Sequence, residues 1–155
     1  MTYSKLLVLF LSVFPLNAIY AQNTSDYKLI LFIDDELILR GKVSNFKIKY
    51  LEKEIDVQYD LASIKYQISD LDKKVFFESG KVECTFNYLD HKRQDLLSFN
   101  IKLDAWELDA GYLILRIYNR TKENQRKFRF GSNAFLYEYE SAIGYHLLPR
   151  RKGRK

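Results

Sequence analysis

Basic side chains are the most prominent chemical groups of this sequence, and they gather in its last 40 residues. Residues 22–115 contain 13 lysines and arginines against 17 aspartates and glutamates, a net charge of −4. Residues 116–155 contain 11 lysines and arginines against 3 acidic residues, a net charge of +8. Because a cluster of like charges attracts ligands of opposite sign, the later part of the chain is predicted to contact an anionic partner.

Two segments hold these cations. The first surrounds a predicted loop of residues 119–129, and the second is the tail of residues 150–155. The predicted partner-binding side chains are Arg116, Arg120, Lys122, Arg126, Lys127, Arg129, Arg150, Arg151, Lys152, Arg154 and Lys155. The alternative is that the loop is a solvated hairpin tip and the tail a solubilising, disordered end.

A second group of side chains surrounds the single tryptophan. Asp104, Glu107 and Asp109 flank Trp106, and such groups could ligate calcium or flank a sugar. Their spacing does not match a calcium-binding loop, and a carboxylate pair for glycoside hydrolysis would have to flank a cleft. An acidic turn with the tryptophan at the edge of the core is the simpler interpretation. A small secreted carbohydrate-binding protein or hydrolase using these residues is the alternative function.

Motifs for metal binding and catalysis are missing from the sequence. His91 and His146 lie in different polar segments without a second ligand at metal spacing, so no metal or cofactor is expected. There is no glycine-rich phosphate loop and no nucleophile elbow, and we expect a protein that is not an enzyme. The single cysteine, Cys84, shares the phase of Val82 and Phe86, which predicts a buried thiol.

Residues 1–21 have the pattern of a secretory signal peptide. Lys5 precedes an apolar stretch of residues 6–16, and small residues follow at Ala18 and Ala21. A helix of that stretch would be roughly 16 Å long, about half of the ~30 Å hydrocarbon core of a bilayer. We therefore expect cleavage near Ala21, a single β domain over residues 22–149, and no transmembrane segment in the mature chain.

Export narrows the choice of partner. Nucleic acid is a common partner of basic patches, but an exported protein rarely meets it. The expected partner is an anionic envelope component or an acidic protein surface. The expected role is a non-catalytic interaction or structural module of the cell envelope or secreted space, in the periplasm or outside the cell.

The basic residues must be positioned by strands, and the strongest predicted strand is the stretch of residues 112–119. Its alternation places Leu113, Leu115 and Ile117 on one face, and its other face is also largely apolar, as in a central strand. Shorter alternating stretches recur between polar or glycine breaks. They cover residues 27–33, 43–50, 55–59, 64–68, 82–88, 97–103, 128–130 and 135–139.

This pattern predicts an all-β chain, an antiparallel β-sandwich with immunoglobulin-like architecture, with a small β-barrel as the alternative. A short helix competes near residues 70–79, because Ser69 and Asp72 resemble a capping box and Gly80 could end the helix. The predicted core consists of Phe46, Ile48, Val57, Ile64, Val82, Phe86, Phe99, Ile101, Leu113, Leu115 and Ile117.

Overall fold

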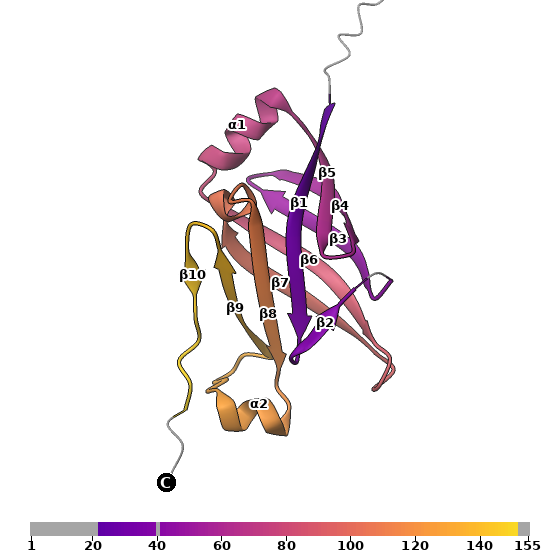
Figure 1. Cartoon of the computed structure of the whole chain (residues 1–155), viewed down its shortest axis with the longest axis vertical. Coiled ribbons are helices and arrows are strands. Elements are labelled where there is room, and N and C mark those ends of the chain that lie inside the picture. The colour runs from indigo at the N-terminus through magenta and orange to yellow at the C-terminus, as the bar shows by residue number, and fades with distance from the viewer. Residues whose placement is uncertain (1–21, 40, 152–155) are drawn as a thin grey trace, which may run out of the picture.

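A single curled β-sheet forms most of the computed structural model, which describes residues 22–39 and 41–151 (Figure 1). The predicted signal peptide and the tail residues Lys152, Arg154 and Lys155 lie outside these residues. The strands are β1 (Gln22–Ile33), β2 (Glu36–Ile38), β3 (Val43–Tyr50), β4 (Lys53–Asp60), β5 (Ser63–Ser69), β6 (Lys81–Asp90), β7 (Asp95–Asp104), β8 (Tyr112–Asn119), β9 (Phe135–Ser141) and β10 (Tyr145–His146). The helices are α1 (Asp70–Glu78), the 3-10 helix η1 (Ala105–Leu108) and α2 (Lys122–Lys127).

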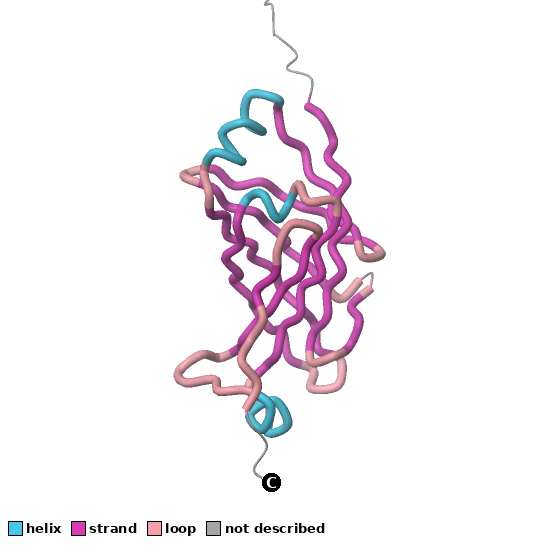
Figure 2. Tube along the Cα trace, turned by 60° about the vertical axis from the view of Figure 1, so that its left-hand side comes forward, coloured by secondary structure: helices cyan, strands magenta, loops and turns pink. Residues whose placement is uncertain are grey.

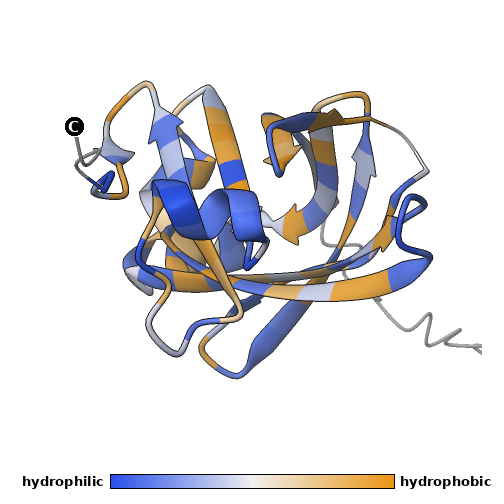
Figure 3. Ribbon diagram, turned by 90° about the horizontal axis from the view of Figure 1, so that it is seen from below, coloured by the Kyte–Doolittle hydropathy of each residue, from blue (hydrophilic) through white to orange (hydrophobic). Residues whose placement is uncertain are grey.

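The strand order is β10-β9-β8-β1-β5-β4-β3-β6-β7, with β2 paired to β1 beside this path. The sheet curls around its apolar face into a half-barrel, as the end view of Figure 3 shows. The predominance of strands is confirmed. The predicted sandwich is not confirmed, because the described strands belong to one hydrogen-bonded sheet, and the prediction of purely antiparallel pairing is wrong, because β1 and β8 are parallel.

The core lies inside the curl, and all the residues predicted for it are buried. The alternation of β8 is as expected, since Leu113, Leu115 and Ile117 are at most 1% exposed. β8 is also central, lying between β1 and β9. A strand with neighbours on both edges and an apolar inner face is well buried, which explains the density of β-branched and aromatic residues in this stretch.

The helices lie at the ends of the strands (Figure 2). The predicted helix near residues 70–79 is α1, and the Ser69 hydroxyl accepts a hydrogen bond from the main-chain N–H of Asp72 at 3.1 Å. Phe76 of α1 is fully buried, with its ring 5.1 Å from that of Tyr50. α1 therefore covers one end of the half-barrel.

The other end differs from the prediction. The predicted strand of residues 128–130 is not formed, and Phe128 and Phe130 instead pack with Tyr118 in a second, smaller apolar cluster. The predicted loop of residues 119–129 contains α2. Phe128 and Phe130 alternate with Arg129 because both phenylalanines are buried in this small cluster. The alternation of apolar residues did not distinguish this arrangement from an edge strand.

Candidate functional site

α2 begins where β8 ends, and its capping explains why a polar stretch becomes helical. The Thr121 hydroxyl accepts a hydrogen bond from the Asn124 main-chain N–H at 3.1 Å. Glu123 lies in the first turn, whereas Arg126 and Lys127 lie in the last, the arrangement that the helix dipole favours. The Thr-x-x-Asn spacing and this order of charges were the signals in the sequence for this helix.

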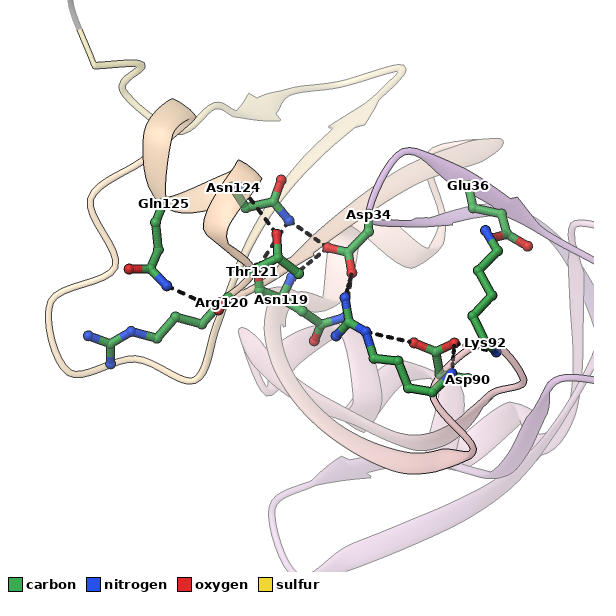
Figure 4. A network of polar contacts seen from close by, with 10 residues as sticks. Asp34, Glu36, Asp90, Lys92, Asn119, Arg120, Thr121, Asn124 and Gln125 are labelled. Carbon is green, nitrogen blue, oxygen red and sulfur yellow. Dashed lines mark hydrogen bonds and ion pairs between the residues drawn. The ribbon is translucent and has the colours of Figure 1, made fainter.

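Asp34 holds α2 in place (Figure 4). It lies in the two-residue turn between β1 and β2, and its carboxylate accepts hydrogen bonds from the Asn119 main-chain N–H at 2.8 Å and the Asn124 side-chain amide at 2.6 Å. The Asn119 side-chain amide donates to its second oxygen at 3.0 Å. Asn124 is only 3% exposed, so this carboxylate satisfies a buried amide and joins segments far apart in the chain.

Both turn residues have positive φ, 50° at Asp34 and 65° at Asp35, as a tight type I′ hairpin requires. Aspartate tolerates this backbone conformation better than most residues because its short side chain can hydrogen-bond locally. In the sequence Asp34 and Asp35 follow the predicted strand of residues 27–33 as a polar break, and nothing in that pattern indicates that Asp34 anchors α2.

A further polar network surrounds this end of the sheet. The Arg93 guanidinium lies 3.4 Å from the Asp90 carboxylate and 3.9 Å from the Asp34 carboxylate. Glu36 accepts hydrogen bonds from Lys42 at 2.7 Å and Lys92 at 2.8 Å, and these two ammonium groups lower the pKa of its carboxyl to about 2. The β1–β2 and β6–β7 turns are thus joined by charge pairs.

Three of the predicted partner-binding cations make ion pairs or cation–π contacts within the fold. The Arg116 guanidinium lies 5.3 Å from the centre of the Phe32 ring. Lys127 pairs with Asp35 at 3.0 Å and Glu123 at 3.1 Å. The third, Arg150, binds the buried carboxylate of Glu138.

Arg150 fastens the beginning of the tail to the body. It donates a hydrogen bond to Glu138 at 3.0 Å, and its guanidinium lies 4.2 Å from the centre of the Phe128 ring. Glu138 is buried and also accepts from the Tyr118 hydroxyl at 2.7 Å. Burial and this hydrogen bond raise the pKa of Tyr118 above its ordinary value. Arg150 is therefore a structural residue.

The remaining described cations of the set are exposed. They have no ion-pair partner within residues 22–39 and 41–151, and we call them the cationic end: Arg120, Lys122, Arg126, Arg129 and Arg151. The main-chain N–H of Arg151 donates to the Lys127 carbonyl at 2.9 Å, so the tail starts beside α2. Seen from below in Figure 3, α2 is strongly hydrophilic. The structure thus brings the loop and tail segments together.

Two of the acidic residues beside the tryptophan, Asp104 and Glu107, have different environments. Asp104 pairs with Lys81 at 2.7 Å, whereas Glu107 is buried and its Oε2 atom has no hydrogen-bond partner in the described part of the chain. The exposed Trp106 ring stacks on Phe77 of α1 with 5.4 Å between centroids. Asp104 is thus paired and Glu107 buried, so these two carboxylates are not both presented to solvent beside Trp106.

The other candidate groups are placed as follows. His91 and His146 are both exposed, and no group of three His, Cys, Asp or Glu side chains suited to a metal occurs among the described residues. The predicted burial of Cys84 is confirmed, with 2% exposure, and burial raises the pKa of its thiol to about 12. None of the helices in the described ranges is long and apolar enough to cross a membrane.

No protein-family model matches the chain, and no curated protein or solved structure is significantly similar to it.

Proposed function

We propose that the chain is an exported, non-catalytic interaction module of the cell envelope or secreted space that binds an anionic partner through the cationic end. The observation that supports this proposal most directly is the division among the basic residues. Arg116, Lys127 and Arg150 are occupied inside the fold, whereas the five residues of the cationic end are exposed and unpaired within the described residues.

The backbone under these cations is held in place before any partner arrives. Asp34 anchors the start of α2, and Arg150 and the Arg151 main chain anchor the start of the tail. A preorganised surface loses less conformational entropy on binding than a flexible loop would. Four of the five side chains are arginines, whose planar guanidinium can bind carboxylate or phosphate in a bidentate manner.

The proposed partner is an anionic envelope component or an acidic protein, because the signal-like pattern of residues 1–21 favours export. Charge attraction of this kind is screened over about 8 Å at physiological ionic strength. Binding should therefore weaken steeply as salt is added.

The test reverses two charges in the cationic end, Arg126→Glu with Arg129→Glu, and compares retention on a carboxymethyl-dextran surface over a salt series. The matched control is Lys73→Glu with Lys74→Glu in α1, at the opposite end of the sheet, because it changes the net charge equally. The first variant should lose most of its retention, and the control should keep it. A pull-down from an envelope fraction with the same variants then identifies the partner.

Equal losses for the two variants would mean that net charge alone governs retention, and the proposal would be wrong. Circular dichroism of each variant checks that the sheet persists.

A further inference from the structure

The half-barrel does not close, and its two sides face one another across a groove. The strand order ends at β7 on one side, and β9, which lies nearby, is not paired with β7 in the sheet. The rings of Phe99 and Phe135 meet edge to face at 5.1 Å, and the Tyr137 hydroxyl donates to the Lys102 carbonyl at 3.0 Å. A groove of about 500 Å³ lies here.

The Tyr137 contact shows which main-chain groups of β7 are free. The Lys102 carbonyl points away from β6, and in an antiparallel strand the N–H and C=O of one residue lie on the same edge, with alternate residues on alternate edges. The Ala105 N–H donates a hydrogen bond to the Gly80 carbonyl, just beyond the β6–β7 pair. By this register the odd-numbered residues of β7 direct their main-chain groups toward β6. Leu96, Ser98 and Asn100 therefore present their main-chain groups outward.

This edge lacks the usual protections against strand pairing. β7 is 10 residues long, contains no proline, and pairs with β6 without a register shift. Lys102 is the one lysine on it, and it is already paired with Glu83 at 3.1 Å. Leu96 on the same edge is 61% exposed. The Lys102 carbonyl is taken by Tyr137, but the regular, exposed part of the edge before it, from Leu96 to Asn100, is a template for another strand.

The groove has both apolar and polar walls. Its lining consists of Asn100, Lys102, Asn133, Ala134, Phe135, Leu136, Tyr137, His146 and Leu148. This set holds a lysine and a histidine but no carboxylate. β10 covers β9 only at Tyr139 and Glu140, so the first half of β9 has no strand on that side among those described.

We propose that this groove binds an extended segment of a partner polypeptide, which adds to β7 as a further strand. Free main-chain N–H and C=O groups are matched by another polypeptide backbone, and the apolar wall at Phe135 and Leu148 receives alternate side chains. Lipid and polysaccharide offer no such repeating main-chain partner.

The partner segment is neutral or acidic. Asn133 and Leu148 lie at the end of the groove next to α2, because Leu148 packs against the cluster of Phe128 and Phe130. A segment that leaves the groove there meets the cationic end, so acidic residues flank its strand-forming part. The expectation of acidic flanking residues rests on the proposed function, whereas strand addition itself does not.

The test selects binders from a phage-displayed library of random peptides against the purified chain. Asn100→Pro removes one outward N–H, a change that an edge strand tolerates, and Asn100→Ala keeps that N–H and serves as the matched control. Enriched peptides should alternate apolar residues and contain an excess of aspartate and glutamate. They should bind the Pro variant roughly tenfold more weakly than the Ala variant.

Amide hydrogen exchange provides a readout on the unaltered chain. The amides of Ser98 and Asn100 should exchange fast in the free protein and slowly with a selected peptide bound, whereas Phe99 and Ile101 should be protected in both states. The absence of enriched peptides, equal binding to the Pro and Ala variants, or unchanged exchange would overturn strand addition.

Two further outcomes point to other occupants and also overturn it. A dimer in sedimentation that Asn100→Pro abolishes would mean that a second copy occupies the edge. Protection of the same amides by anionic vesicles without peptide would assign the groove to lipid. Peptide binding that fails while Arg126→Glu with Arg129→Glu still lowers carboxymethyl-dextran retention would leave the proposed function standing.

Discussion

Two adjacent arginines, Arg150 and Arg151, should respond very differently to replacement by alanine. Arg150 binds the buried Glu138 and lies over the Phe128 ring, whereas the side chain of Arg151 is exposed and unpaired among the described residues. The sequence offers no reason to separate them. Arg150→Ala should destabilise the fold and Arg151→Ala should not.

The expected loss in free energy of unfolding for Arg150→Ala follows from the burial of each partner in the ion pair. Removing one member of a fully buried ion pair costs about 3–5 kcal/mol. Here the Glu138 side chain is 4% exposed but that of Arg150 is 54% exposed. Solvent screening therefore reduces the loss to about 1–2 kcal/mol. Loss of the contact with the Phe128 ring adds about 0.5–1 kcal/mol, so we expect about 2 kcal/mol in total.

Urea unfolding followed by circular dichroism measures the difference. With a slope of about 1–3 kcal/mol per molar urea, the midpoint of Arg150→Ala should fall by about 1 M. Arg151→Ala should stay within about 0.5 kcal/mol of the parent, as is usual for exposed positions. Similar midpoints for the two variants would refute the structural role of Arg150.

A second variant isolates the cause. Glu138→Gln removes the buried charge, so Arg150→Ala made in that background should cost clearly less than in the parent. Equal costs in the two backgrounds would mean that Arg150 acts through the rings alone. Tests of the tail in partner binding should accordingly leave Arg150 in place, because deleting it changes the fold as well as the charge.

Leu115→Ala should cost about 2–5 kcal/mol in free energy of unfolding, because its side chain is 1% exposed in the central strand, and a loss under ~1 kcal/mol in urea unfolding would contradict its placement. Cys84 should react slowly with a thiol reagent in the native state and quickly in denaturant, since its thiol is buried with a pKa of about 12; rapid native labelling would show an open strand. The pKa of Glu36 is lowered from 4.5 to about 2, so its contribution to stability is complete above pH 4.5 and lost as pH falls toward 2. Glu36→Gln should flatten this part of the stability profile measured by urea midpoints, and an unchanged profile would count against the pairs with Lys42 and Lys92.

The amino-acid sequence by itself determined which face of each main strand is buried. The alternation of apolar residues predicted the core from Phe46 to Ile117, the burial of Cys84 and the bounds of β3 and β8. These features depend on the side-chain period of two and on the hydrophobicity of each residue, both local properties. The capped helix α1 was predictable for the same reason, since Ser69 and Asp72 are three residues apart.

The tertiary structure alone decided which strands pair and which cations are available. Period shows the buried face of a strand but not its neighbour, so the parallel pairing of β1 with β8 and the open edge of β7 were not predictable. The same holds for the anchoring of α2 by Asp34, because Asp34 and Asn119 are 85 residues apart in sequence. Net charge counts Arg150 and Arg151 alike, and only the buried carboxylate of Glu138 separates the structural arginine from the exposed one.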